Sequence, residues 1–129
     1  MIKSEKEIVS EFFEIVRSGK DIHRASEFMA EKVIAHQVQA EEEHSVTRSP
    51  QNYTDHVAEM QDMYGDFSLE VQEILADEAK VYVRWRQTGR SKSGKEIIEI
   101  ASAVYLVVDG KIVEYWIQID RKGLELQQY

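Results

Sequence analysis

Three residues of this 129-residue chain have side chains and a spacing that suit acid–base chemistry: Trp116, Gln118 and Asp120. Side chains alternate between the two faces of a β-strand, so we expect these three to point into one cavity. A carboxyl group beside tryptophan in an apolar cleft has its charged form disfavoured, which raises its pKa toward a range useful for acid–base catalysis. The alternative is that Asp120 begins a C-terminal turn, because aspartate before Arg-Lys-Gly-Leu suits a turn equally well.

His36 is the second catalytic candidate, near the end of a short predicted strand over residues 33–38. Imidazole titrates near neutral pH, so it could shuttle a proton or donate a hydrogen bond to a substrate carbonyl. The alternative is a histidine that bonds only to backbone groups at the end of a strand.

Aromatic and sulfur-containing side chains form a stripe at helical spacing: Tyr53, Met60, Met63 and Tyr64. Such a stripe usually packs in a core, and the alternative is that it lines a pocket. In the second case we expect Tyr53, Met60 and Tyr64 to contact a substrate, together with Trp116 and Gln118.

Four polar residues fall on two neighbouring predicted strands: Arg84, Arg86, Gln87 and Glu99. They could form a polar array in a pocket or ion pairs on the outer face of a sheet. Exposed cross-strand ion pairs are common and weak, which favours the structural role.

Composition excludes several classes of function. The chain has 16 basic and 24 acidic residues, a net charge of −8 that would repel nucleic acid and anionic membranes. It has no cysteine, hence no thiolate nucleophile or thiolate metal site. The four histidines are scattered and no glycine-rich phosphate loop is present, so we expect no metal and no cofactor. Without a membrane span or a signal-peptide pattern, a cytoplasmic location is expected.

Helical signals come first along the chain. Ser4 and Glu7 form a capping box before an apolar stripe that ends at Gly19. Asp21 could cap a second, shorter helix, and Ser49-Pro50 begins a third that ends at Gly65.

From residue 67 onward the apolar period changes from 3.6 to 2, which predicts a strand meander. The strands are expected to start near Phe67, Val81, Glu96 and Lys111, with Glu41-Glu42-Glu43 earlier as a solvated loop. Asp109-Gly110 is typical of a type I′ hairpin turn. Helices followed by a meander predict a single α+β domain over residues 1–129, with N-terminal helices packed on a curved antiparallel sheet.

This order of elements resembles the nuclear transport factor 2-like superfamily, and within it the SnoaL-like polyketide cyclase or ester cyclase group. The segments that carry the resemblance are Phe12-Phe13, Val33-Ile34-Ala35-His36, Val83-Arg84-Trp85, Val108 to Trp116, Asp120, Gly123-Leu124 and Gln127-Gln128. The resemblance implies a cone with an internal pocket, frequent homodimers, and catalysis of an intramolecular aldol closure. Asp120 would match the acid/base of the group and His36 a histidine near the mouth of the cone. The group's histidine on the second-to-last strand has no counterpart between Glu96 and Tyr115.

These observations together predict a cofactor-free acid/base cyclase or isomerase that acts on a small hydrophobic carbonyl compound. A non-catalytic ligand-binding or dimerisation module of the same fold is the alternative, and an epoxide-hydrolase-like activity is the second. Both faces of residues 96–108 are apolar, and helices from one short chain cover only one face of a sheet. We therefore expect a homodimer through the outer face.

Overall fold

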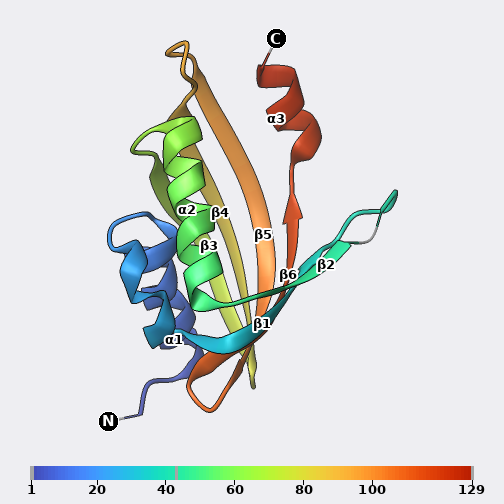
Figure 1. The fold of residues 1–129 in the computed structure, drawn as a ribbon. Helices are drawn as coiled ribbons and strands as arrows, with labels where there is room; N and C mark the ends of the chain where they lie inside the picture. Colours follow the sequence, from blue (N-terminus) through green and yellow to red (C-terminus); the bar gives the residue numbers. More distant parts are fainter. Residues whose placement is uncertain (1, 43, 129) are drawn as a thin grey trace.

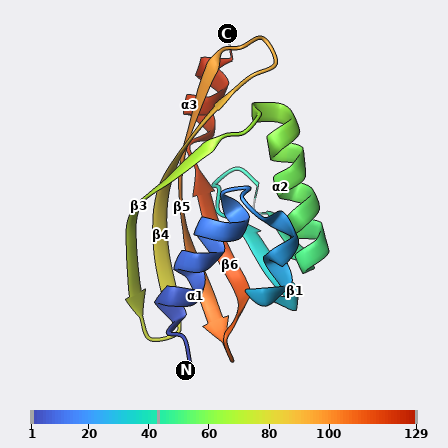
Figure 2. The ribbon, with the colours of Figure 1, turned by 90° about the vertical axis from the view of Figure 1, so that its left-hand side faces the viewer.

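The structure is a computed structural model that describes residues 2–42 and 44–128. A strongly curved sheet has α1 and α2 on one face, and α3 continues from the last strand (Figures 1 and 2). The elements in order are α1 Glu5–Phe12, η1 Phe13–Arg17, η2 Ile22–Glu27, β1 Met29–Gln37, β2 His44–Arg48, α2 Pro50–Tyr64, β3 Ser68–Asp77, β4 Lys80–Arg90, β5 Glu96–Val108, β6 Lys111–Ile119 and α3 Arg121–Gln127.

The first helix begins as the sequence predicts, with a reciprocal capping box between Ser4 and Glu7. At Phe13 the helix widens into the π-helical turn η1. This turn carries Arg17, which is only 5% exposed, into the interior. π-Helical turns often occur at functional sites.

The next two helices differ in how closely they follow the prediction. The segment after Asp21 is a 3-10 helix (η2), and the Asp21 side chain makes no capping hydrogen bond, so the predicted cap is wrong. The longer helix α2 starts as predicted, with Ser49 as N-cap and Pro50 in the first turn. It ends at Gly65, whose φ of 68° few other residues adopt easily.

The sheet has the order β2-β1-β6-β5-β4-β3. All neighbouring pairs are antiparallel, as predicted, except β1 and β6, which are parallel, so the sheet is mixed. Parallel neighbours require a long crossover, which the segment from β2 to β5 supplies here. The α+β class itself is confirmed.

One turn and one strand show what local sequence could and could not reveal. Asp109 and Gly110 have φ angles of 52° and 78°, as a type I′ turn between β5 and β6 requires. The strand β2, which pairs with β1, was missed because the acidic run before it was interpreted only as a loop. Glu43 of that run lies outside the described residues.

Strand parity separates the two faces of the sheet. Val81, Val83 and Trp85 of β4 point toward the helices and are fully buried. Phe13 packs against Trp85 with ring centroids 5.0 Å apart. No helix in the described part of the chain is long and apolar enough to cross a membrane.

Candidate functional site

A cavity of about 220 Å³ lies between the sheet and α2. Its walls come from η1, β1, β2, α2, β5 and β6. The residues that line it are Arg17, Gln37, Arg48, Tyr53, His56, Met60, Met63, Tyr64, Glu99, Tyr105, Tyr115, Ile117 and Ile119. The cavity therefore combines an apolar wall with a few buried polar groups, which is typical of small-molecule sites.

A buried polar cluster, formed by Arg17, Gln87 and Glu99, contributes to one wall. Arg17 Nη1 donates a hydrogen bond of 2.7 Å to Gln87 Oε1, and its Nη2 lies 3.4 Å from Glu99 Oε1. The guanidinium also packs over the rings of Phe67 and Trp85, 5.7 and 5.6 Å from their centroids. These contacts hold Arg17 in one position against the carboxylate.

Glu99 is 9% exposed, and burial raises the pKa of its carboxyl group. The charge of Arg17 and, to a smaller extent, the indole N–H of Trp85 oppose this rise. That N–H is buried and lies beside Glu99, but makes no hydrogen bond of regular geometry among the described residues. A carboxyl group whose pKa is moved toward neutrality suits a general acid or base.

His56 and Arg48 form another part of the lining. Burial lowers the pKa of His56 to about 4, and the charges of Arg48 and Arg17 act in the same direction. The imidazole is therefore neutral at pH 7, where it can donate one hydrogen bond and accept another.

Three tyrosines complete the polar lining: Tyr53, Tyr105 and Tyr115. Burial raises the pKa of each of these phenols above the ordinary value of 10.0. Their hydroxyl groups stay protonated at neutral pH, so they are available to donate hydrogen bonds to a ligand oxygen.

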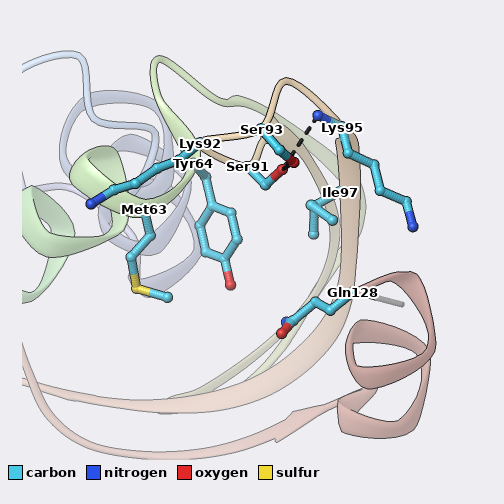
Figure 3. A pocket seen from close by; sticks show the side chains of 8 residues that line it. All are labelled: Met63, Tyr64, Ser91, Lys92, Ser93, Lys95, Ile97 and Gln128. Atoms are coloured by element: carbon cyan, nitrogen blue, oxygen red, sulfur yellow. Dashed lines mark hydrogen bonds between the residues drawn. The ribbon is translucent and has the colours of Figure 1, made fainter.

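An outer hollow of about 360 Å³ adjoins the cavity, and both are lined by Met63 and Tyr64 (Figure 3). Its other walls are the loop between β4 and β5, Ile97, and Gln128 after α3. Burial raises the pKa of Tyr64, and the negative charge of Glu99 adds to this effect, which places the phenol near the buried cluster. Tyr64 thus stands between the outer hollow and the cavity.

Some of the residues predicted from sequence line the cavity. Tyr53, Met60 and Tyr64 do so, as the pocket-lining interpretation of the helical stripe required. Whether they contact a substrate stays a prediction.

Trp116, Gln118 and Asp120 are not among the cavity-lining residues, so the predicted orientation is wrong. On β6 the side chains that line the cavity are the alternate ones, Tyr115, Ile117 and Ile119. The alternation of side chains along the strand correctly placed Trp116 and Gln118 on one face. It did not reveal which face the helices cover.

Asp120 is the N-cap of α3. Its Oδ1 accepts a hydrogen bond of 2.9 Å from the Gly123 N–H, and its side chain is exposed. This is the turn interpretation left open by the sequence. A side chain at position 123 would displace this carboxylate, because an added Cβ would collide with Asp120 Oδ2.

His36 is not among the cavity-lining residues either; it faces the outer side of the sheet. Its ring stacks on Trp116, with centroids 5.3 Å apart. Its Nδ1 lies 2.7 Å from Ser45 Oγ and its Nε2 lies 2.5 Å from Glu114 Oε2. The histidine is bonded to side chains rather than to backbone, so neither the pocket interpretation nor the backbone one is correct.

The predicted polar array divides between the two faces. Gln87 and Glu99 point inward, whereas Arg84 and Arg86 lie on the outer face, where Arg84 donates to Gln72. A signal for Glu99 was present in the sequence. It is the only charged residue at the inward positions 97, 99, 101, 103, 105 and 107 of β5.

Metal ligands do not gather around the cavity. Within residues 2–42 and 44–128, no three side chains of histidine, aspartate or glutamate converge as a metal would require. The chemistry of the lining is that of hydrogen-bond donors, two guanidinium groups and one carboxyl group.

Comparison with known proteins adds the family context. A model of the family described as SnoaL-like polyketide cyclase matches residues 7–128. No curated protein matches the chain.

Several solved structures have similar folds. A candidate polyketide cyclase from Acidithiobacillus ferrooxidans is 22% identical, with a TM-score of 0.78 over 98% of this chain and 96% of that one. IdmH, a candidate polyketide cyclase from Streptomyces antibioticus, is 20% identical, with a TM-score of 0.81 over 98% and 99%. An LEH-like epoxide hydrolase from M. tuberculosis is 15% identical, with a TM-score of 0.72 over 95% of this chain and 87% of that one. At these identities the likeness establishes the fold alone.

Proposed function

The chain belongs to the SnoaL-like polyketide cyclase family, and we propose that it catalyses cofactor-free proton transfer on a small carbonyl compound bound in the cavity. The observation that carries this proposal is Glu99, a buried carboxyl group with a raised pKa that Arg17 holds in the cavity wall. Glu99 takes the acid/base role that the sequence had suggested for Asp120.

The chemistry follows from the groups that line the cavity. The Glu99 carboxylate removes a proton from a carbon next to the substrate carbonyl, and the electron pair of that C–H bond moves to the carbonyl oxygen. Buried tyrosine hydroxyls donate hydrogen bonds to the negative charge that develops there. Return of the proton to another carbon gives an isomerisation.

A cyclisation uses the same groups. The enolate carbon attacks a second carbonyl carbon of the same molecule, and the resulting alkoxide takes the proton back from Glu99. Atoms and charges balance without a cofactor or a metal ion. The neutral His56 supplies a second hydrogen-bonding group for either oxygen.

Size limits the substrate. A cavity of about 220 Å³ is smaller than the range typical for drug-sized ligands. A larger substrate has to extend past Tyr64 into the outer hollow, whose volume is about 360 Å³. The reacting carbonyl would then lie inside the cavity, with the rest of the molecule toward the loop between β4 and β5.

Proton exchange tests the proposal without knowledge of the natural substrate. Small ketones and 1,3-diketones are incubated in deuterium oxide, and incorporation at the carbon next to the carbonyl is followed by NMR. The wild-type protein should accelerate exchange, and Glu99→Gln should remove at least 99% of the acceleration, since general-base catalysis contributes about 10²–10⁴-fold. Glu114→Gln on the outer face is the matched control. Equal rates for wild type and Glu99→Gln would contradict the proposal.

Two alternatives remain from the sequence. A non-catalytic ligand-binding module would bind the same ketones without exchange. Epoxide hydrolysis has some support, because a similar fold belongs to an epoxide hydrolase-like protein and the cavity places an arginine beside a carboxyl group. Glu99 is the only carboxyl group that lines the described cavity, whereas water activation by that mechanism needs two. We therefore rank it lower.

We also propose that the chain forms a homodimer through the outer face of the sheet. A mainly apolar row crosses five strands on this face, made of His36, Trp116, Val104, Tyr82 and Leu75 in register. Leu75 is 57% exposed. The other four side chains are half-buried. A contiguous, mainly apolar surface on the open face of a sheet is typical of a protein–protein contact.

A further inference from the structure

Arg48 is a cavity residue that makes no ion pair with any described residue. It ends β2 and lines both the cavity and an open hollow of about 420 Å³ beside α2. The hollow is also lined by Asp55 and Glu59, but neither carboxylate lies within ion-pair distance of Arg48. Among residues 2–42 and 44–128, no carboxylate lies within 4.0 Å of a nitrogen of Arg48.

The Nε–H group of Arg48 is also without a partner. This group is fully buried and has no hydrogen-bond acceptor among the described residues. The guanidinium contacts the hydroxyl of Tyr115, whose pKa it lowers against the larger effect of burial. A buried N–H without an acceptor is costly. Protein atoms enclose this one, so a ligand in the cavity would have to meet the Nη groups of Arg48.

The charges of the cavity lead to the same conclusion. Arg17 and Glu99 balance each other, and His56 is neutral at pH 7 because its pKa is about 4. Arg48 is then a net positive charge within a protein whose total charge is −8. A partly buried charge without a partner is unfavourable, and an anionic ligand removes that cost.

We propose that the substrate carries a carboxylate, which Arg48 binds. The two Nη groups of the guanidinium present N–H donors side by side, a geometry that matches the two oxygens of a carboxylate. The substrate class is then a small keto acid, with its carboxylate at Arg48 and its acidic carbon at Glu99. The placement of the acidic carbon at Glu99 rests on the proposed function, whereas the placement of the carboxylate at Arg48 does not.

Paired ligands test the inference directly. Pyruvate, acetoacetate and levulinate are compared with their methyl esters, which keep the carbonyl but lack the charge. Binding is measured by titration calorimetry and by NMR shift changes. We expect the wild-type protein to bind at least one acid about tenfold or more tightly than its ester.

Variants identify the residue responsible. Arg48→Gln should remove the preference for the acid, and Arg48→Lys should keep part of it, because lysine retains the charge without the paired N–H groups. Arg84→Gln on the outer face removes the same charge elsewhere and should leave the preference unchanged. Thermal unfolding of each variant shows that the fold is intact.

The outcomes separate this inference from the proposed function. Preferential binding of the acids through Arg48 without proton exchange would support the carboxylate site and contradict the proposed catalysis. Exchange that is equally fast with acids and esters would support the catalysis and contradict the carboxylate site. Failure of the wild-type protein to bind any of the three acids would overturn the inference, as would an unchanged preference in Arg48→Gln.

Discussion

Arg17 and Glu99 form a buried ion pair, 3.4 Å between Nη2 and Oε1, that joins the π-helical turn η1 to strand β5. Their side chains are only 6% and 11% exposed. The pair fixes a carboxyl group inside the cavity and at the same time connects the first helix to the sheet. Stability and the proposed proton transfer would therefore depend on the same two residues.

Removal of Arg17 should be strongly destabilising. Arg17→Met leaves the Glu99 carboxylate and Gln87 without their partner, and loss of one member of a buried pair costs about 3–5 kcal/mol. Urea unfolding measures the change. Arg84→Met, on the outer face, should cost less than about 1 kcal/mol. A loss for Arg17→Met as small as that control would contradict the structural role of the pair.

The pH dependence of stability should reveal Glu99. Its raised pKa means that folding favours the protonated acid, so its stabilising contribution is complete below the unfolded value of 4.5. That contribution is lost as the pH rises through the folded value. Glu99→Gln cannot ionise, so the melting temperature of the variant relative to wild type should increase with pH above 4.5. A difference that stays constant with pH would contradict the raised pKa.

His56 should make the protein sensitive to acid. Its folded pKa of about 4 lies below the unfolded value of 6.5, so the unfolded chain binds the proton first as the pH falls. The protein should lose up to about 3 kcal/mol of stability between pH 6.5 and about pH 4 from this group. His56→Gln should be less sensitive in that window, and the exposed His23→Gln should behave like wild type. NMR titration of the His56 ring gives the pKa directly.

Asp120 should matter for α3 and not for chemistry. Asp120→Ala removes the acceptor for the Gly123 N–H, and loss of an N-cap costs about 0.5–2 kcal/mol. Asp120→Asn keeps an acceptor and should be close to wild type. Both variants should retain any ketone exchange activity of the wild-type protein. Loss of exchange in a folded Asp120→Asn protein would return Asp120 to the catalytic role.

The proposed dimer predicts a mass of twice 15.0 kDa by light scattering at micromolar concentration. Val104→Glu places a charge in the centre of the apolar row on the outer face and should give the monomer. Leu126→Glu adds the same charge on the exposed surface of α3, where Leu126 is 58% exposed, and should leave the mass unchanged. A wild-type mass near 15.0 kDa would contradict the dimer.

Local sequence signals determined the elements and several of their boundaries. The capping residues Ser4 and Ser49 begin their helices, and Asp109-Gly110 forms the predicted turn. These features depend on hydrogen bonds and φ angles within a few residues, so the sequence contains all that is needed to predict them. The order of these elements predicted the α+β class, and the family resemblance agreed with it.

Tertiary structure decided which side of each strand lines the cavity. Alternation correctly grouped Trp116 with Gln118, but a period of two is symmetric and does not say which group the helices cover. The helices pack on the side of Tyr115 and Ile117, so the predicted cavity residues of β6 point the other way. The parallel pairing of β1 with β6 was likewise outside the reach of local patterns. The Arg17–Glu99 pair joins residues 82 positions apart, and only the packing of η1 on β5 brings the two charges together in the wall of the cavity.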